Sequence, residues 1–381
     1  MRFRLGSTLV AVMLVGTGSQ ILLAQQKAGP PPPKKSPLLK LVEAWPEDDV
    51  LKARRTEADS RRLFKEHDPL AFTLTADFKA INKNRDPEST KRFPAVLAVA
   101  DGKGAPRDIE VKLGTRGHFR LMARNCDFVP LRLELPKEGT AGTAFEAQTT
   151  LKLGTHCRGD KAYESYTIRE YLTYRLFNML TPLSFRARLG RATYVDSATK
   201  KPVATRYSIF VEHENEVARR FGGRIVELPR IVFKDLDAQT LTRMMLFEYM
   251  IGNTDFSIWA LHNVRIAQDP ARRLYPVPYD FDLSGFVHAP YATPDPRIGI
   301  RSVLDRLYRG PCRTTDEFEA VAAAFRAKRG DMLALLESMR DLDSDAKSEA
   351  KEYLESFFRA IEKPNAIKKQ FVDSCKPAPT M

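Results

Sequence analysis

The chain of 381 residues carries 61 Lys and Arg against 48 Asp and Glu, which gives a formal charge of +13 at neutral pH. This balance attracts anionic partners, but the basic residues are spread along the whole chain and are not interleaved with aromatic residues as in nucleic-acid-binding platforms. We therefore expect a solvated cationic surface and no nucleic-acid partner.

The first 24 residues have the pattern of a secretory signal peptide. Arg2 and Arg4 form a charged start, the apolar run from Leu9 to Gly16 is short for a bilayer span, and Ala24 precedes a polar stretch. The alternative is an uncleaved membrane anchor. We predict cleavage and a secreted or periplasmic protein of charge 13 − 2 = +11, with no transmembrane segment because no later apolar run reaches membrane length.

Composition then divides the chain into further segments. Residues 25–48 contain QQKAGPPPPKKSP and form a linker, since proline lacks a backbone donor and fixes φ. A charged helical lead-in is expected over 49–68. The remainder divides into a β-rich part, 69–212, and a helical part with polar loops, 213–376.

The β-rich part contains short runs in which apolar and polar residues alternate, as in half-buried strands. One helix with apolar residues on a single face is expected among them, over 164–180. The expected strands are 70–78, 94–101, 109–116, 129–135, 149–155, 187–196 and 205–213.

Helical periodicity dominates the second part, interrupted by a small polar hairpin. This order of elements is that of protein kinases. We therefore expect an α+β, protein-kinase-like fold with two lobes, namely a β-rich N-lobe with one helix and an α-helical C-lobe. The expected helices are 214–223, 237–253, 302–310, 315–339 and 344–363, with Thr314 or Ser344 as N-caps.

Four polar residues gather around the hairpin. Asp255 follows a Gly-Asn-Thr turn after the long helix, Asn263 begins the strand NVRI, and Asp280 and Asp282 flank a Phe after the strand LYPVPY. Carboxylate and amide oxygens are the ligands that Mg²⁺ prefers. Taken singly, each Asp is an ordinary turn residue or a solvated strand end; taken in this order, the set predicts a metal-phosphate site.

A phosphate-binding cation is expected from the β-rich part. Lys152 lies in the strand TTLKLGT, and Glu170 follows eighteen residues later within the next helix, where it could hold the lysine. The alternative places both side chains in solvent. Lys112 is the rival lysine, and Arg116 and Arg120 in TRGHFR are rival phosphate ligands, although this turn has only one glycine.

Other chemistries lack their residues. No GxSxG motif is present for a serine hydrolase, and the six histidines are scattered. The four cysteines show no CxxC spacing, so disulfides are expected in an exported chain. Of the three connectivities, we favour Cys126 with Cys157 and Cys312 with Cys375, because each bridge then stays within one half of the chain.

At the polar residues the chain resembles the CotH (spore coat protein H) kinase-like family. The resemblance rests on GNTD, HN and PVPYDFDLSG, and upstream on VKLGTRGHFR, SYTIREYL and YSIFVEHEN. It covers about Phe72 to Gly310. The family consists of secreted or surface-associated atypical kinases, some of which phosphorylate proteins.

The resemblance implies a role for individual residues. Asp255 takes the catalytic position, Asn263 and Asp280 the metal positions with Asp282 as a further ligand, and Glu212 the hinge beside an adenine pocket. Two departures stand out. The spacing of eight from Asp255 to Asn263 is longer than in most kinases, and His118, Phe119 and Arg120 replace the family's Asn-Ser-Ser element.

The sequence therefore predicts an exported atypical kinase that transfers the γ-phosphate of ATP, with Mg²⁺ or Mn²⁺, to Ser or Thr hydroxyls of a protein substrate. The first alternative is a catalytically inactive pseudokinase or surface-binding module of the same fold, since ATP is scarce outside the cytoplasm. The second is a metal-dependent phosphoesterase that uses the three carboxylates.

Overall fold

The computed structural model describes residue 36 and residues 38–100 and 103–375. The predicted signal peptide, residues 1–24, lies outside the described residues, as does the proline-rich linker up to residue 35. Among the described residues, no helix is both long enough and apolar enough to cross a membrane.

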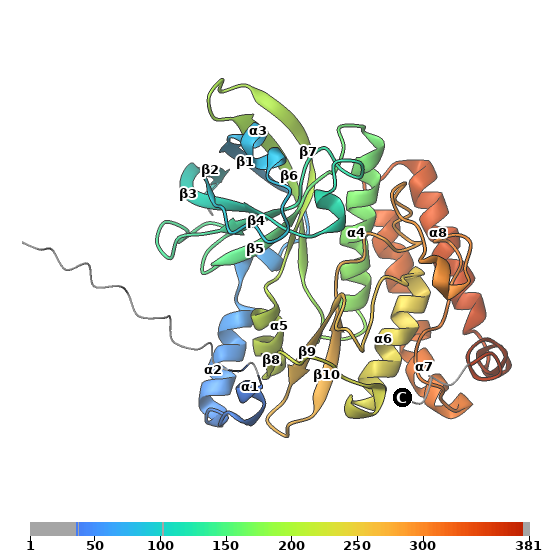
Figure 1. Ribbon diagram of the computed structural model, residues 1–381. Coiled ribbons are helices and arrows are strands. Elements are labelled where there is room, and N and C mark those ends of the chain that lie inside the picture. The colour runs from blue at the N-terminus through green and yellow to red at the C-terminus, as the bar shows by residue number, and fades with distance from the viewer. Residues whose placement is uncertain (1–35, 37, 101–102, 376–381) are drawn as a thin grey trace, which may run out of the picture. The chain divides into compact units, whose positions relative to one another are not determined.

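Seven strands form a closed barrel in the order β1-β2-β3-β4-β5-β7-β6 (Figure 1). All neighbours are antiparallel except β1 and β6, which pair in parallel from Leu70 opposite Gly190 to Ala76 opposite Asp196 and so close the barrel. The strands are β1 (Leu70–Ala76), β2 (Phe93–Ala100), β3 (Pro106–Thr115), β4 (Leu131–Glu134), β5 (Thr150–Gly154), β6 (Ala187–Asp196) and β7 (Pro202–Val211).

One buried cluster belongs to the barrel. Alternation along β1 buries Phe72, Leu74 and Ala76, as the period of two requires. These side chains meet those of the other strands, with Phe72 and Phe210 in ring contact at 5.0 Å. The short helix α3 (Phe78–Lys83), capped by Asp77, adds Phe78 and Ile81 to this cluster.

A second, three-stranded sheet has the order β10-β9-β8 and is antiparallel throughout. Its strands are β8 (Arg224–Val226), β9 (Val264–Gln268) and β10 (Leu274–Pro278). Helix α5 (Glu214–Phe221) precedes β8 and packs against it, and helix α6 (Ala238–Ile251) packs against β10. The lead-in begins earlier than predicted, within the expected linker, and forms α1 (Leu39–Val42) and α2 (Asp48–Asp59). Helix α2 packs on α5.

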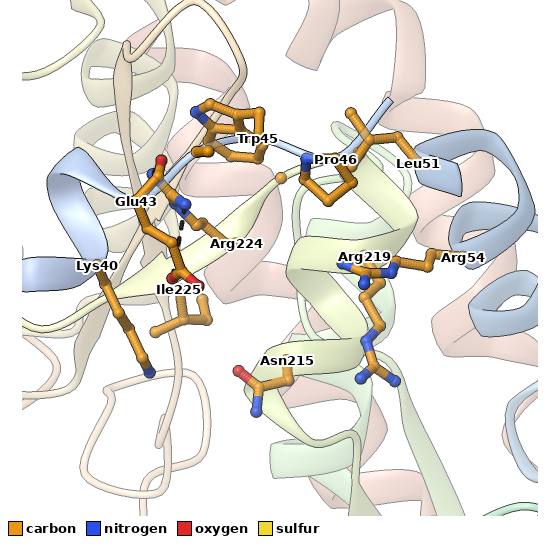
Figure 2. Close-up of a pocket in the computed structure, with 13 residues that line it drawn as sticks. Lys40, Glu43, Trp45, Pro46, Leu51, Arg54, Asn215, Arg219, Arg224 and Ile225 are labelled. Atoms are coloured by element: carbon orange, nitrogen blue, oxygen red, sulfur yellow. Dashed lines mark hydrogen bonds and ion pairs between the residues drawn. The ribbon is translucent and has the colours of Figure 1, made fainter. Parts of the chain in front are cut away.

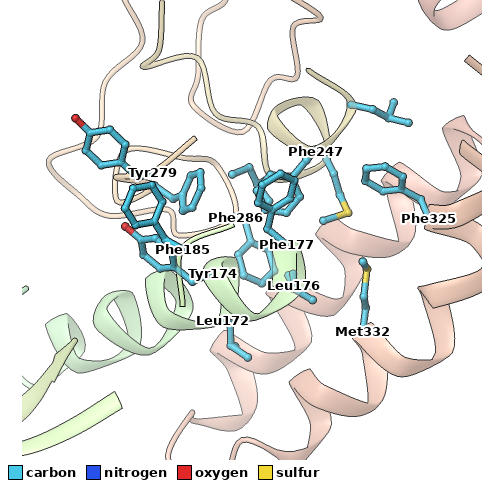
Figure 3. Close-up of a cluster of buried hydrophobic side chains, with 14 of the residues drawn as sticks. Leu172, Tyr174, Leu176, Phe177, Phe185, Phe247, Tyr279, Phe286, Phe325 and Met332 are labelled. Atoms are coloured by element: carbon cyan, nitrogen blue, oxygen red, sulfur yellow. The ribbon is translucent and has the colours of Figure 1, made fainter. Parts of the chain in front are cut away.

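The long helix α4 (Ala162–Asn178) lies against β6 and β7 (Figure 1), and the remaining helices pack on α6 and on one another. They are α7 (Thr315–Ser338), α8 (Ser344–Ala360) and α9 (Pro364–Ile367). Figure 3 shows the aromatic cluster between these elements, in which the rings of Phe177 and Phe247 lie 4.4 Å apart. Burial of this cluster therefore joins α4 to α6.

Both predicted disulfides are confirmed. Cys126 bonds to Cys157 and Cys312 bonds to Cys375. These bonds are typical of proteins that fold in an oxidising compartment.

The prediction of a two-lobed protein-kinase-like fold is wrong. The mixture of α and β elements is as expected, but β6 returns to pair with β1, so the strands close into a barrel and do not form an open N-lobe sheet. The described residues from 38 to 375 belong to one compact unit, and the boundary expected at residue 212 stays a prediction.

Three local expectations also fail. Residues 302–310 contain no helix. The lead-in helix ends at Asp59 and is followed by a short 3₁₀ turn, not by helix up to residue 68. Asp343, not Ser344, caps α8, because its carboxylate accepts the Ala346 N–H at 2.8 Å, whereas Thr314 caps α7 as expected.

Candidate functional site

A cavity of about 650 Å³ lies between the rim of the barrel and the β9–β10 hairpin. This volume is within the range of small-molecule sites. Acidic and amide groups reach it from the hairpin side, together with Arg265 and His262, and the other cationic groups reach it from the barrel side. The polar lining residues used below are Arg116, Arg120, Lys152, Asp255, His262, Asn263, Arg265, Tyr279, Asp280 and Asp282.

Asp255 is positioned by the turn that ends α6. Gly252 adopts φ +64° there, and a Cβ at this position would lie 1.9 Å from the Tyr353 hydroxyl, so only glycine fits. The Asn253 side-chain oxygen then accepts the Asp255 N–H at 3.0 Å. Asp255 is left 38% exposed at the cavity, within reach of a ligand from solvent.

Both carboxylate oxygens of Asp255 have neighbours. The His262 ring nitrogen Nε2 lies 3.2 Å from one oxygen, and this hydrogen bond raises the pKa of His262. The Asn263 amide nitrogen donates to the other oxygen at 2.9 Å and to the Asp255 carbonyl at 2.7 Å. Both of these hydrogen bonds use the amide nitrogen of the buried Asn263 side chain. Its amide oxygen accepts no hydrogen bond from the described residues.

The hairpin register brings Asp280 to the same edge. Val264 pairs with Pro278, and the Tyr279 N–H donates to the Asn263 carbonyl at 3.0 Å. Asp280 itself has φ +67°, and its N–H donates to the Tyr174 hydroxyl at 3.1 Å. Its carboxylate forms no hydrogen bond or ion pair with the described residues, so it is available to a cation.

Asp282 lies deeper, 7% exposed. The Tyr291 hydroxyl donates to its carboxylate at 3.2 Å, and an Arg120 nitrogen lies 3.9 Å from the same oxygen. Burial and the negative charge of Asp280 raise the pKa of Asp282. A bound cation would relieve this repulsion.

Arg120 also lies 3.9 Å from Glu170, which is buried in α4. Burial and the charge of Asp282 raise the pKa of Glu170. Burial alone would lower the pKa of Arg120, but Tyr291 and the two carboxylates raise it, so Arg120 keeps its charge. One guanidinium therefore serves two carboxylates.

Lys152 projects from β5 into the cavity, where its ammonium lies 4.1 Å from the centre of the Tyr279 ring and 4.0 Å from Glu214. Burial, followed by the positive charge of Arg116, lowers the pKa of Lys152 to about 7. Glu214 is shared with Arg265, whose guanidinium donates to it at 3.0 Å. An added anion near Lys152 would favour its charged form.

The sequence prediction of the site is only partly reproduced by this geometry. Asp255, Asn263, Asp280, Asp282, Arg116 and Lys152 line one cavity. The predicted pairing of Lys152 with Glu170 is wrong, because the described ion pairs are those of Lys152 with Glu214 and of Glu170 with Arg120.

Glu212 does not line the cavity. It is 1% exposed and accepts two hydrogen bonds from Arg220, at 2.8 and 2.7 Å, and one from the Arg186 N–H at 2.9 Å. All these partners are protein groups. The predicted nucleotide contact is therefore replaced by a buried structural ion pair between the end of β7 and α5.

Sequence reasoning missed three residues of the site. Glu214 stands in the first turn of α5, where acidic residues are common for helix stability alone. Arg265 alternates with apolar residues in β9 like any solvent-facing strand residue. Tyr291 lies in the loop HAPYATP, which carries no motif that predicts its hydrogen bond to Asp282.

The oxygen atoms at the cavity are possible ligands of a divalent cation. No described group of three or more His, Cys, Asp and Glu side chains is arranged as a metal site. The possible ligands here are the carboxylates of Asp280 and Asp282 and the amide oxygen of Asn263. The Asp280 carboxylate and the Asn263 amide oxygen accept no hydrogen bond from the described residues. Hard oxygen atoms of this kind fit Mg²⁺ or Mn²⁺, which take one or two carboxylates and complete their shells with water and phosphate.

Comparison with known proteins adds no assignment: no protein-family model matches the chain, and no curated protein matches it.

Proposed function

We propose that this cavity binds ATP with Mg²⁺ or Mn²⁺ and transfers the γ-phosphate to a Ser or Thr hydroxyl of a protein. One observation carries the proposal: the carboxylate and amide oxygens of the hairpin wall face Arg116, Arg120 and Lys152 of the barrel wall across about 650 Å³. Phosphoryl transfer needs this division of charge, because cations must hold the phosphates while oxygens hold the metal.

Each group has a role in this proposal. Lys152 and Arg116 bind phosphate oxygens, and Arg116 has no side-chain partner among the described residues. Asn263, Asp280 and Asp282 would hold the metal ion, which supplies neutralisation of phosphate charge. The barrel ladder fixes Lys152 within the barrel, and its contact with the Tyr279 ring sets its position relative to the hairpin.

Asp255 would orient the acceptor hydroxyl and take its proton. Its carboxylate is held from two sides by Asn263 and His262 and remains partly exposed. A side chain of a protein substrate can therefore reach it from solvent. The proton would pass from the acceptor oxygen to the Asp255 carboxylate as the new phosphorus–oxygen bond forms, while the bond from the γ-phosphorus to the bridging oxygen breaks and ADP leaves.

Two other features support an exported kinase. The two disulfides are compatible with an oxidising compartment. The resemblance of GNTD, HN and PVPYDFDLSG to the CotH kinase-like family favours the same activity, independently of the fold class.

One observation favours a binding module without turnover. Arg120 already lies 3.9 Å from Asp282 and 3.9 Å from Glu170, so part of the acidic charge is neutralised within the protein. A site of this kind could bind nucleotide phosphates with little need for a metal ion.

Thermal shifts and phosphate transfer separate the two functions. For the wild type we expect stabilisation by ADP with Mn²⁺ and labelling of an acceptor protein from γ-labelled ATP. Asp280→Asn should lose both, whereas Asp255→Asn should keep the stabilisation and lose labelling by about 100-fold or more. Asp108→Asn, a substitution of an exposed carboxylate outside the cavity, is the control.

The outcomes are distinct. Stabilisation without labelling in the wild type would support the binding module. Lack of stabilisation at millimolar nucleotide with either metal would refute both proposals. Equal labelling by Asp280→Asn and the wild type would refute the assignment of the metal ligands.

A further inference from the structure

A second cavity, of about 280 Å³, lies where the lead-in meets α5 and β8 (Figure 2). It is lined by basic side chains from four separate elements. They are Lys40 of α1, Arg54 of α2, Arg219 of α5 and Arg224 of β8, and the acidic residue among the lining residues is Glu43.

The wall formed by the lead-in is fixed by several contacts. The Arg224 guanidinium donates to the Glu43 carbonyl at 3.1 Å and stacks 4.1 Å from the Trp45 ring centre. Arg272 donates to the Leu41 carbonyl at 2.8 Å. Arg224 is in turn held by the side-chain oxygen of Gln268, at 3.0 Å. The cavity is therefore a built feature and not a gap beside a loose segment.

The cations of this cavity are poorly neutralised. The Glu43 carboxylate is 3.8 Å from Arg224 but 66% exposed, and exposed pairs contribute little. Arg219 pairs with Glu216 at 2.7 Å. Lys40 and Arg54 have no side-chain hydrogen bond or ion pair with any described residue.

Two further features add to this positive environment. The Asn215 side-chain amide lines the cavity and has no partner among the described residues. Burial lowers the pKa of Arg224, the Glu43 carboxylate partly opposes this shift, and the charge of Arg272 adds to it; a bound anion would oppose it further. Several donors thus line one small space, in which the exposed Glu43 carboxylate is the acidic group.

We infer that this cavity is a binding site for a phosphate group, held by Lys40, Arg54 and Asn215 together with Arg219 and Arg224. Its volume suits a phosphate with a small substituent. Two sources have this chemistry: a free phosphate compound, or the headgroup of an anionic lipid. The lipid source is included because Leu39 and Val42, neighbours of Lys40 in α1, are 53% and 66% exposed. This site is separate from the proposed catalytic cavity, with which it shares no lining residue.

The test compares two double variants of equal charge change. Lys40→Gln with Arg54→Gln removes the two unpaired cations. Lys52→Gln with Lys79→Gln removes two exposed lysines outside the cavity. Titration calorimetry with inorganic phosphate at constant ionic strength, and co-sedimentation with phosphatidylcholine vesicles with and without phosphatidylglycerol, provide the two probes.

We expect saturable binding of at least one probe, weakened at least about tenfold by the first double variant and unchanged in the second, since each lost contact is a charge-assisted hydrogen bond. Binding of phosphate identifies the free compound. Binding of the anionic vesicles alone, weakened by Val42→Ser, identifies the headgroup. The proposal is wrong if neither probe binds the wild type, or if both double variants bind equally.

Discussion

The buried carboxyl of Glu248 provides a sharp test of the electrostatics beneath the candidate site. Glu248 lies in α6, 2% exposed, and neither of its oxygens has a hydrogen-bond partner among the described residues. Burial raises the pKa of Glu248 to about 8, with Asn253 and Arg309 opposing the shift and Asp255 adding to it. The folded protein therefore holds a neutral carboxylic acid here at neutral pH.

The sign and size of the effect on stability follow from linkage. Between pH 4.5 and pH 8 the unfolded carboxyl is ionised while the folded one keeps its proton, so this group makes the wild type less stable as the pH rises. At about 1.36 kcal/mol per unit, the cost reaches about 3 kcal/mol at pH 7 and is small near pH 5. Below pH 4.5 the cost is absent.

Glu248→Gln keeps the shape of the protonated side chain and cannot ionise. With an unfolding entropy of about 2.1 cal/mol/K per residue over roughly 340 residues, the advantage of the variant in Tm should grow by about 4 °C between pH 5 and pH 7. Differential scanning calorimetry across this range measures it. Glu138→Gln, an exposed substitution, is the matched control and should show no such trend. A constant or shrinking difference for Glu248→Gln would refute the reasoning.

Two further predictions concern Lys152 and Glu212. The folded pKa of Lys152 is about 7, well below its unfolded value of 10.5, so Lys152→Met should be more stable than the wild type at pH 6. The difference in Tm between the variant and the wild type should shrink as the pH rises towards 10.5. A difference in Tm that widens with pH would contradict the assigned pKa shift. Glu212→Gln leaves the buried Arg220 without its charge partner and should lower the free energy of unfolding by about 3–5 kcal/mol, which corresponds to a fall in Tm of about 4–7 °C. The affinity of this variant for ADP with Mn²⁺, measured well below Tm, should stay unchanged. A selective loss of nucleotide binding would return Glu212 to the site.

Strand positions were predictable because local alternation fixes them. The strand expected over 187–196 coincides with β6, and that over 149–155 with β5 to within one residue at each end. Closure of the barrel was not predictable. It depends on whether β6 pairs with β1 across the intervening chain, and an alternating strand has the same pattern at an open edge as in a closed ladder.

The candidate site shows the same division between local and non-local information. Asn263 and Asp280 were predicted to lie together because a hairpin register is set locally, and β9 pairs with β10 as expected. The partner of Lys152 was not predictable. A spacing of eighteen residues gives the distance along the chain from Lys152 to Glu170, but it does not show which element packs beside the lysine in the folded protein. The start of α5 lies there and supplies Glu214.

The barrel changes the physical argument about the site, although it overturns the expected fold class. A closed ladder has no free edge, so Lys152 in β5 is fixed by hydrogen bonds to strands on both sides, β4 and β7. Asn263 and Asp280 are fixed by a different sheet. Their approach across the cavity is therefore set by the packing between the barrel and the hairpin, where Tyr279 lies against Lys152 at 4.1 Å and Phe185 at 5.5 Å. Because Tyr279 directly precedes Asp280, the contact that positions Lys152, the proposed phosphate-binding cation, also positions the proposed metal ligand, which couples the two walls of the site.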